Sequence, residues 1–552
     1  MVEELSPGHL EKKAMRQSLD TRNTLPGLDT LAFDNRFTRE LPADPCEDNT
    51  RRQVYQACYS RVHPTAVRAP QLVAFSREAG ELLDLGEQDI RSEQFLQVFV
   101  GNRMLPGMEP HAACYGGHQF GNWAGQLGDG RAINLGEVVN RRGEHWMLQL
   151  KGAGPTPYSR SADGLAVLRS SLREFLCSEA MHHLGIPTTR ALSLMLTGES
   201  VLRDMFYDGH AEMEPGAVVC RLAPSFLRFG NFEILAARGE VDTLRTLVDF
   251  TIRHHFPHLG PVSAETIVQW FNEICQRTAE LMVAWMRVGF VHGVMNTDNM
   301  SILGLTIDYG PYGWLEDYDP TWTPNTTDAM GRRYCYGRQP QIGFWNLAQL
   351  ANALVPLLGS PRPLEEALQG YSQYFERQWQ AMMADKLGLT AFVPETDQPL
   401  VDSLLRFLPT VETDMTIFFR QLAQVPVEAP QEQERITPLL DAFYQPEQLS
   451  DDSRRNLADW LAGYAHRLRQ QPQAQDERIQ RMHRANPKYV LRNFLAQLAI
   501  DKVLEGDYSL VYELLEVLRH PYDEQPGKEH LAQKRPEWAR HRAGCSMLSC
   551  SS

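Results

Sequence analysis

The sequence has no apolar run that approaches the roughly 20 residues needed to cross a bilayer as a helix. Its most apolar long stretch, residues 281–295, is interrupted by Arg287 and His292. The first residues include Glu3 and Glu4 and no apolar core, which disfavours a secretory signal and a mitochondrial transit peptide. We therefore expect a bacterial cytoplasmic protein, with a mitochondrial location as the alternative if the source is eukaryotic.

The chain also lacks an excess of positive charge and an ordered cysteine pattern. Its 54 Lys and Arg residues are outnumbered by 69 Asp and Glu residues, which gives a formal net charge of −15. That balance disfavours binding to nucleic acid, although a local basic cleft for a small phosphate ligand is still allowed. The nine cysteines are scattered, without the spacing of a zinc site or a disulfide framework, so a reduced compartment is expected.

The first half of the chain has the pattern of strands with one helix. Residues 1–59 are rich in Pro, Asp and Asn and predict an extended N-terminal arm. Glycines cluster at 115–130. Strands are then expected at 131–139, 145–151, 188–202 and 217–222, and a helix at 164–184.

The second half has mainly helical periodicity. A long amphipathic helix is expected at 264–289, followed by a polar loop at 292–299 and a short strand at 301–307. Further helices are expected at 344–357, 363–387, 401–424, 450–470 and 486–518. From residue 521 the composition is of mixed charge and predicts a flexible tail.

Several residues in the first half have types suited to phosphate chemistry. The glycines of 128–130 would let backbone N–H groups approach a phosphate, although Gly-Asp-Gly is also common as a plain hairpin turn. Lys151 ends a strand and Glu174 lies in the next helix, the arrangement by which kinases hold a phosphate-binding lysine. Arg221 and Arg228 could bind phosphate oxygens in a bidentate manner. Solvated side chains and ordinary salt bridges are the alternatives for all four.

The strongest local signal is the loop 292–299, followed by Asp308-Tyr-Gly. In kinases a His-x-Asp-x-x-x-x-Asn loop supplies a base and a metal-binding Asn, and Asp-Phe-Gly supplies a second metal ligand. His292 and Asn299 match that spacing, but the base position holds Val294, which cannot accept a proton. Asp298 is the only carboxylate within the loop. The alternative is a turn-rich connection without catalytic function.

Together these segments resemble the selenoprotein O family. The resemblance is carried by residues 115–121, 125–130, 150–160, 168–175, 292–299 and 308–311. It covers about residues 60–520. Members of that family have a protein-kinase-like fold and are called pseudokinases because the usual base is missing.

The resemblance implies an α+β fold that is kinase-like and bilobal. A β-rich N-lobe would occupy residues 60–240. A mainly helical C-lobe with the catalytic and metal loops, extended by extra C-terminal helices, would occupy residues 241–520. The arm at 1–59 and a flexible tail at 521–552, with its terminal cysteine, complete the expected organisation.

The resemblance also implies a reaction. AMP is transferred from ATP to Ser, Thr or Tyr hydroxyls of protein substrates, and pyrophosphate is released, with ATP held in a flipped orientation relative to ordinary kinases. Mg²⁺ is the implied metal, with Mn²⁺ as an alternative. The expected partners are protein substrates, redox-related proteins among them. Neither nucleic acid nor a membrane is an expected partner, and a monomer is expected.

The family's functional residues carry over by motif. Asp298 matches the proton acceptor, and Asn299 and Asp308 match the metal ligands. The matches to nucleotide-binding positions are Gly128, Gly130, Arg131, Lys151, Asp163, Gly164, Glu174, Arg221 and Arg228.

Some relatives form a regulatory disulfide between the tail and the loop after the metal-binding Asp. The first cysteine beyond Asp308 in this chain is Cys335, so a bridge from Cys335 to Cys545 or Cys550 is a hypothesis. A free thiol on the tail is the alternative.

Two other functions compete with AMP transfer. One is an atypical kinase that transfers the γ-phosphate to a protein or a small molecule through Asp298. The other is a non-catalytic ATP-binding scaffold. A scaffold has no need of two metal ligands, so the presence of both Asn299 and Asp308 weighs against it.

Overall fold

The computed structural model describes residues 27–429 and 431–549. These residues form a mixed structure of helices and antiparallel strands. The strands are β1 (Ala32–Phe33), β2 (Tyr59–Arg61), β3 (Gln71–Phe75), β4 (His111–Ala113), β5 (Gly116–Gln119), β6 (Asn122–Gln126), β7 (Ala132–Val139), β8 (His145–Lys151), β9 (Ala166–Val167), β10 (Arg190–Asp204), β11 (Ala211–Ala223), β12 (Phe290–Val291) and β13 (Gly313–Trp314).

The helices are concentrated in the second half of the chain. They are α2 (Arg36–Glu40), α3 (Arg77–Glu81), α4 (Glu87–Ile90), α5 (Glu93–Phe99), α6 (Leu168–His183), α7 (Phe229–Ala237), α8 (Val241–His255), α9 (Ala264–Val288), α10 (Gln339–Leu358), α11 (Arg362–Leu387), α12 (Pro394–Phe407), α13 (Met415–Gln421), α14 (Glu432–Ile436), α15 (Asp451–Arg469), α16 (Gln475–Ala485), α17 (Asn493–Leu504) and α18 (Ser509–Arg519). None of the helices in the described residues is both long and apolar enough to span a membrane.

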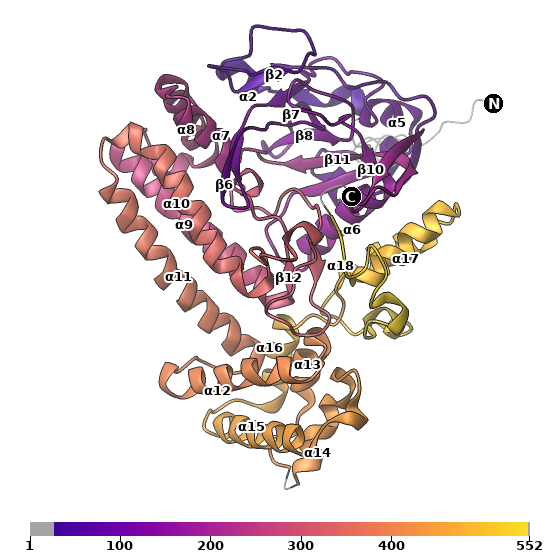
Figure 1. The fold of residues 1–552 in the computed structure, drawn as a ribbon, viewed down its shortest axis with the longest axis vertical. Helices are drawn as coiled ribbons and strands as arrows, with labels where there is room; N and C mark the ends of the chain where they lie inside the picture. The colour runs from indigo at the N-terminus through magenta and orange to yellow at the C-terminus, as the bar shows by residue number, and fades with distance from the viewer. Residues whose placement is uncertain (1–26, 430, 550–552) are drawn as a thin grey trace, which may run out of the picture.

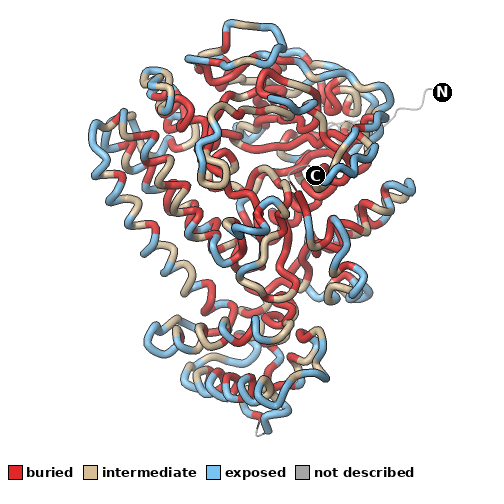
Figure 2. The backbone as a smooth tube through the Cα atoms, viewed as in Figure 1, coloured by how far each residue is buried: buried red, intermediate tan, exposed pale blue. Residues whose placement is uncertain are grey.

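The β-rich part lies at one end of the molecule, and helices α12 to α16 lie at the other (Figure 1). Between them run α9, α10 and α11, which pack along one another. Buried backbone continues from the sheet into these central helices (Figure 2). The loops that follow α9 therefore lie between the sheet and the helical end.

Within the described residues, nine strands form one antiparallel sheet. Its order is β2-β4-β7-β8-β11-β10-β3, with β1 added to β7 and β9 added to β11. Side chains alternate between the two faces of a strand. Leu148 and Leu150 of β8 pack in the core beneath α5. Gln149 and Lys151 therefore point to the opposite face, as does Arg221, which is the register partner of Gln149 on β11.

Helix α6 covers that second face. Its apolar side chains Leu172, Phe175 and Leu176 are fully buried against the sheet. The helix was expected to start at residue 164 but starts at Leu168, because Ala166 and Val167 pair with β11 instead. This packing places Glu174 of α6 directly under the end of β8.

Helix α9 leads into the polar loop. Ser263 caps its first turn by accepting a hydrogen bond from the Thr266 N–H, and Gly289 ends it with a φ of +77°. Loop 292–299 follows after β12. The strand expected at 301–307 is absent from the described structure. Gly304, with a φ of +73°, turns the chain there, and only single bridges form at Ser301 and Thr306.

Two of the expected helices are each broken in two. The helix expected at 401–424 is interrupted around Pro409, and α13 starts afresh at its cap Asp414. The helix expected at 486–518 is interrupted by Gly506, whose φ is +84°. Apolar residues recur at helical spacing on both sides of each break, so this periodicity alone did not reveal the interruptions.

The tail is packed over its described part, residues 521–549, and is not a free segment there. Leu531 and Leu548 are buried, and Leu548 forms a parallel bridge with Asn325. Arg535 donates to Glu412 at 3.0 Å, so the mixed charge of this segment is used in tertiary ion pairs. Cys335 and Cys545 are buried free thiols in the structure. Cys550 and the first 26 residues of the expected N-terminal arm lie outside the described residues.

Candidate active site

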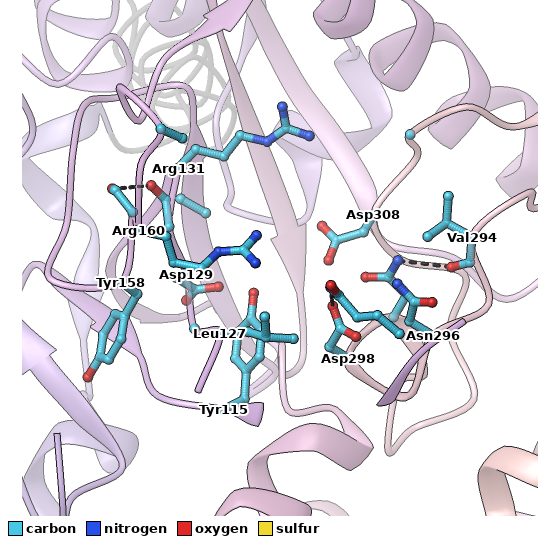
Figure 3. Close-up of a pocket in the computed structure, with 18 of the residues that line it drawn as sticks. Tyr115, Leu127, Asp129, Arg131, Tyr158, Arg160, Val294, Asn296, Asp298 and Asp308 are labelled. Carbon is cyan, nitrogen blue, oxygen red and sulfur yellow. Dashed lines mark hydrogen bonds between the residues drawn. The ribbon is translucent and has the colours of Figure 1, made fainter. Parts of the chain in front are cut away.

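A cavity of about 600 Å³ lies between the sheet and the loop that follows α9. Figure 3 shows Asp129 and Arg131 on the sheet side, facing Asp298 and Asp308 on the loop side. Of the residues expected to bind nucleotide or metal or to act as base, those that line this cavity are Gly128, Gly130, Arg131, Lys151, Arg221, Asp298, Asn299 and Asp308.

A buried network of charges joins the sheet to the loop. Lys151 Nζ donates to Glu174 Oε2 at 2.5 Å, and Arg221 Nη1 donates to Glu174 Oε1 at 2.8 Å. The same Arg221 nitrogen lies 2.7 Å from Asp308 Oδ1, and Arg228 contacts Asp308 Oδ2. Three cations and two carboxylates thus satisfy one another, which is the condition for keeping charges buried.

The network fixes the ionisation of its acids. Burial alone would raise the pKa of Asp308, but Arg228 and Arg221 outweigh burial and hold that pKa well below its usual range. The pKa of Glu174 is lowered in the same way, because Lys151 and Arg221 outweigh the effect of burial. Asp308 also has a φ of +54°, an uncommon backbone conformation for a non-glycine residue. The site therefore presents a permanently charged carboxylate on a constrained backbone.

Asp298 is in a different electrostatic state. Burial raises its pKa to about 7, against the opposing effects of Gln119 and Arg228. Its Oδ1 is buried and has no hydrogen-bond partner within the described part of the chain, and its Oδ2 accepts from Gln119 Nε2 at 3.2 Å. A carboxylate that titrates near neutrality is suited to accept a proton from a hydroxyl group.

The rest of the loop orients Asn299. His292 Nε2 lies 2.9 Å from the Ile307 carbonyl, and its ring stacks on Trp285. Asn299 Nδ2 donates to the Val294 carbonyl at 2.9 Å. Because the amide nitrogen is occupied, the oxygen is the atom that Asn299 can offer to a ligand. An amide oxygen and an ionised carboxylate on one cavity wall fit a hard divalent cation.

Close packing explains why glycine occupies two positions of the segment 128–130. Gly128 has a φ of +87°, and a Cβ there would lie 2.4 Å from the Tyr158 ring. A Cβ on Gly130 would lie 2.9 Å from the Tyr158 carbonyl. These glycines let the chain pass Tyr158 closely while lining the cavity.

Not every expected site residue faces the cavity. Asp163 forms an ion pair with Arg203 at 2.7 Å, and Gly164 packs against Gly154, so neither lines the cavity. Glu174 and Arg228 do not line the cavity either, but they contact its lining residues Lys151 and Asp308.

Sequence reasoning passed over other lining residues. Asp129 lies between Gly128 and Gly130, where the sequence also fits a plain turn. It lines the cavity and is 3% exposed. Arg160 ends the motif 150–160 and lines the same wall. Gln119 lies within the motif 115–121, but its contact with Asp298 depends on tertiary docking that no sequence spacing reveals.

Comparisons with known proteins identify the family of the chain. The sequence model of the family described as "Protein adenylyltransferase SelO" matches residues 48–519. A protein of Rhodopirellula baltica named "Protein nucleotidyltransferase YdiU" is 62% identical over 536 residues, which cover 95% of this chain and 99% of the relative. A protein of the same name from Aromatoleum aromaticum is 61% identical, over 95% of this chain and 99% of the relative. The corresponding protein of Nitrosospira multiformis is 56% identical, over 96% of this chain and 98% of the relative. The chain therefore belongs to the SelO family of protein adenylyltransferases.

Proposed function

We propose that this protein transfers AMP from ATP to Ser, Thr or Tyr hydroxyl groups of protein substrates. The observation that carries the proposal is the pair of carboxylates on one cavity wall. Asp308 is held ionised by two arginines, whereas Asp298 titrates near neutrality. Family membership supports a nucleotide substrate and a protein acceptor.

In the proposed reaction, the acceptor oxygen attacks the α-phosphorus and the bond from that phosphorus to the β-phosphate bridging oxygen breaks. Asp298 accepts the hydroxyl proton, and the bond electrons leave with pyrophosphate. Position 294, where a kinase has its base, holds a buried valine, so the hydroxyl proton needs another acceptor. Asp298 lies four residues further along the same loop and lines the cavity.

The cationic side chains would bind the phosphates. Lys151, Arg131 and Arg221 line the cavity from the sheet side, where phosphate oxygens could bind Arg131 and replace carboxylate partners of Lys151 and Arg221. Asn299 and Asp308 would hold a divalent cation, Mg²⁺ or Mn²⁺, which supplies charge neutralisation at the phosphates. Arg228 would keep Asp308 oriented from behind.

The architecture suits a bilobal, kinase-like arrangement. We place the N-lobe at residues 60–240, which contain most of the sheet and α6, and the C-lobe at 241–520, which contains the loop and helices α9 to α18. The arm at 1–59 and the tail at 521–552 would flank these lobes. The relatives compared are bacterial, which supports a location in the bacterial cytoplasm, and we propose that the protein acts there as a monomer.

Labelled ATP tests the proposal. The protein is incubated with a metal ion and either α-labelled or γ-labelled ATP, and modified hydroxyl groups are identified by mass spectrometry. We expect the α-label and a mass increase of one AMP in the product, and a large reduction of both in Asp298→Asn, which should still bind nucleotide. Transfer of the γ-label would support a kinase, and nucleotide binding without transfer of either label would support a scaffold. Either result would overturn the proposal.

A further inference from the structure

The hairpin β5–β6 contacts the proposed catalytic loop at three successive residues. In the described structure this hairpin is a two-stranded sheet of its own, separate from the nine-stranded sheet. Its donors and their acceptors are the His118 N–H to Thr297 Oγ1 at 2.7 Å, Gln119 Nε2 to Asp298 Oδ2 at 3.2 Å, and the Phe120 N–H to Asn296 Oδ1 at 3.2 Å. The hairpin is thus hydrogen-bonded to each of residues 296–298.

Glycine lets the hairpin approach Asp298 closely. A Cβ on Gly117 would lie 2.8 Å from Asp298 Oδ1 and 3.0 Å from the Asp298 Cβ. Any side chain at position 117 would therefore displace the carboxylate. Gly117 confines the Oδ1 side of the carboxylate, while Gln119 holds the Oδ2 side.

Arg228 also hydrogen-bonds to Asp298, but to its backbone and not to its carboxylate. Arg228 Nη1 donates to the Asp298 carbonyl oxygen at 2.9 Å. Oδ1 has no hydrogen-bond partner among the described residues. One amide donor on Oδ2 leaves that oxygen a second lone pair, so the contact orients the carboxylate without using up its capacity to accept a proton.

We propose that Gln119 is a positioning residue for AMP transfer, which fixes the Asp298 carboxylate between its own amide and the backbone of Gly117. This inference rests on the proposed role of Asp298. The hairpin belongs to the β-rich part of the chain, and the loop belongs to the helical part. Gln119 therefore makes the orientation of the proton acceptor depend on how these two parts meet.

The variant Gln119→Met tests the inference, because it keeps the length of the side chain and removes the donor. We expect kcat to fall about 10- to 100-fold, the cost of a small misplacement of a reacting group. The Kd for ATP, measured by calorimetry, and the thermal midpoint should stay near those of the parent protein. Asn122→Ala is the matched control, because Asn122 lies exposed on the same hairpin and, among the described residues, its side chain makes a single long hydrogen bond of 3.5 Å to the Phe120 carbonyl.

A double variant separates positioning from general support of the fold. If Gln119 acts through Asp298, Gln119→Met should have no further effect on the residual rate of Asp298→Asn. Unchanged kcat in Gln119→Met, while kcat of Asp298→Asn falls to a small residual value, would overturn the inference and leave the proposed function standing. Equal losses of kcat and of ATP affinity would also overturn it, because they indicate a structural role. Full activity of Asp298→Asn would instead overturn the proposed function.

Discussion

The buried charge network predicts a specific response to the substitution Glu174→Gln. Glu174 accepts from Lys151 at 2.5 Å and from Arg221 at 2.8 Å, and it is 1% exposed. Removing one partner from a buried ion pair leaves uncompensated charge and typically costs about 3–5 kcal/mol. We expect the free energy of unfolding to fall by that amount, which is about a 100- to 4,000-fold change in the folding equilibrium.

Nucleotide should recover part of this loss. If phosphate oxygens bind Lys151 and Arg221, they supply the negative charge that Glu174→Gln removes. The assay is urea unfolding followed by circular dichroism, with and without saturating ATP and Mg²⁺. We expect the difference from the parent protein to be smaller with nucleotide than without it.

Helix α6 offers a matched control one and a half turns further on. Glu179 is 2% exposed and accepts from Arg190 at 2.7 Å, away from the cavity. Glu179→Gln should cost a similar free energy, but nucleotide should not reduce the difference from the parent protein. The reasoning is refuted if both variants respond equally to nucleotide, or if Glu174→Gln costs less than about 1 kcal/mol, the upper end of what an exposed ion pair typically contributes.

Three other predictions follow from the described contacts. Burial raises the pKa of Glu316 from 4.5 to about 7, and neither of its carboxylate oxygens has a hydrogen-bond partner among the described residues. The folded protein therefore keeps a proton that the unfolded chain releases, so stability falls as pH rises from about 4.5 to 7, by about 3 kcal/mol in all. Glu316→Gln should raise the unfolding free energy by up to that amount at pH 8 and change it little at pH 4; an equal change at both pH values would contradict this. Asp308→Ala should abolish transfer and the metal-dependent part of ATP binding, measured by calorimetry with and without chelator, and retention of metal-dependent binding would exclude Asp308 as a ligand. Val294→Asp should not restore activity to Asp298→Ala in the labelled-ATP assay, whereas transfer of the γ-label by that double variant would show that a base at 294 is in line.

The sequence predicted most reliably those parts of the fold that depend on local periodicity. Strand β8 occupies residues 145–151 as expected, and the alternation along it puts Lys151 on the face of α6. A strand-end lysine followed by a glutamate in the next helix allowed a contact between Lys151 and Glu174 but left other partners open, and the structure has that contact. The reaction and the roles of these residues were inferred from the family resemblance. The comparisons confirm that the chain belongs to that family.

Features that depend on tertiary contacts escaped the sequence. Gly116 to Gln119 form a strand, although two glycines gave it no strand-like composition, because the hairpin is stabilised by docking on loop 296–298. The mixed-charge composition of the tail predicted a flexible segment, but Arg535 forms ion pairs with Glu412 and Asp317. In both segments the partners are distant in sequence, which a local pattern cannot reveal.

The two arginines that contact Asp308 affect how a metal ion and a nucleotide would bind together. A divalent cation alone would draw Asp308 away from both arginines, which would leave Arg228 without its counterion in a buried space while Arg221 keeps Glu174. A triphosphate alone would bind Arg221 and bring its own negative charge beside Asp308. Each partner removes the penalty that the other creates, so their binding should be strongly cooperative. The apo cleft would thus discriminate against free metal and free nucleotide and select the preformed complex of the two.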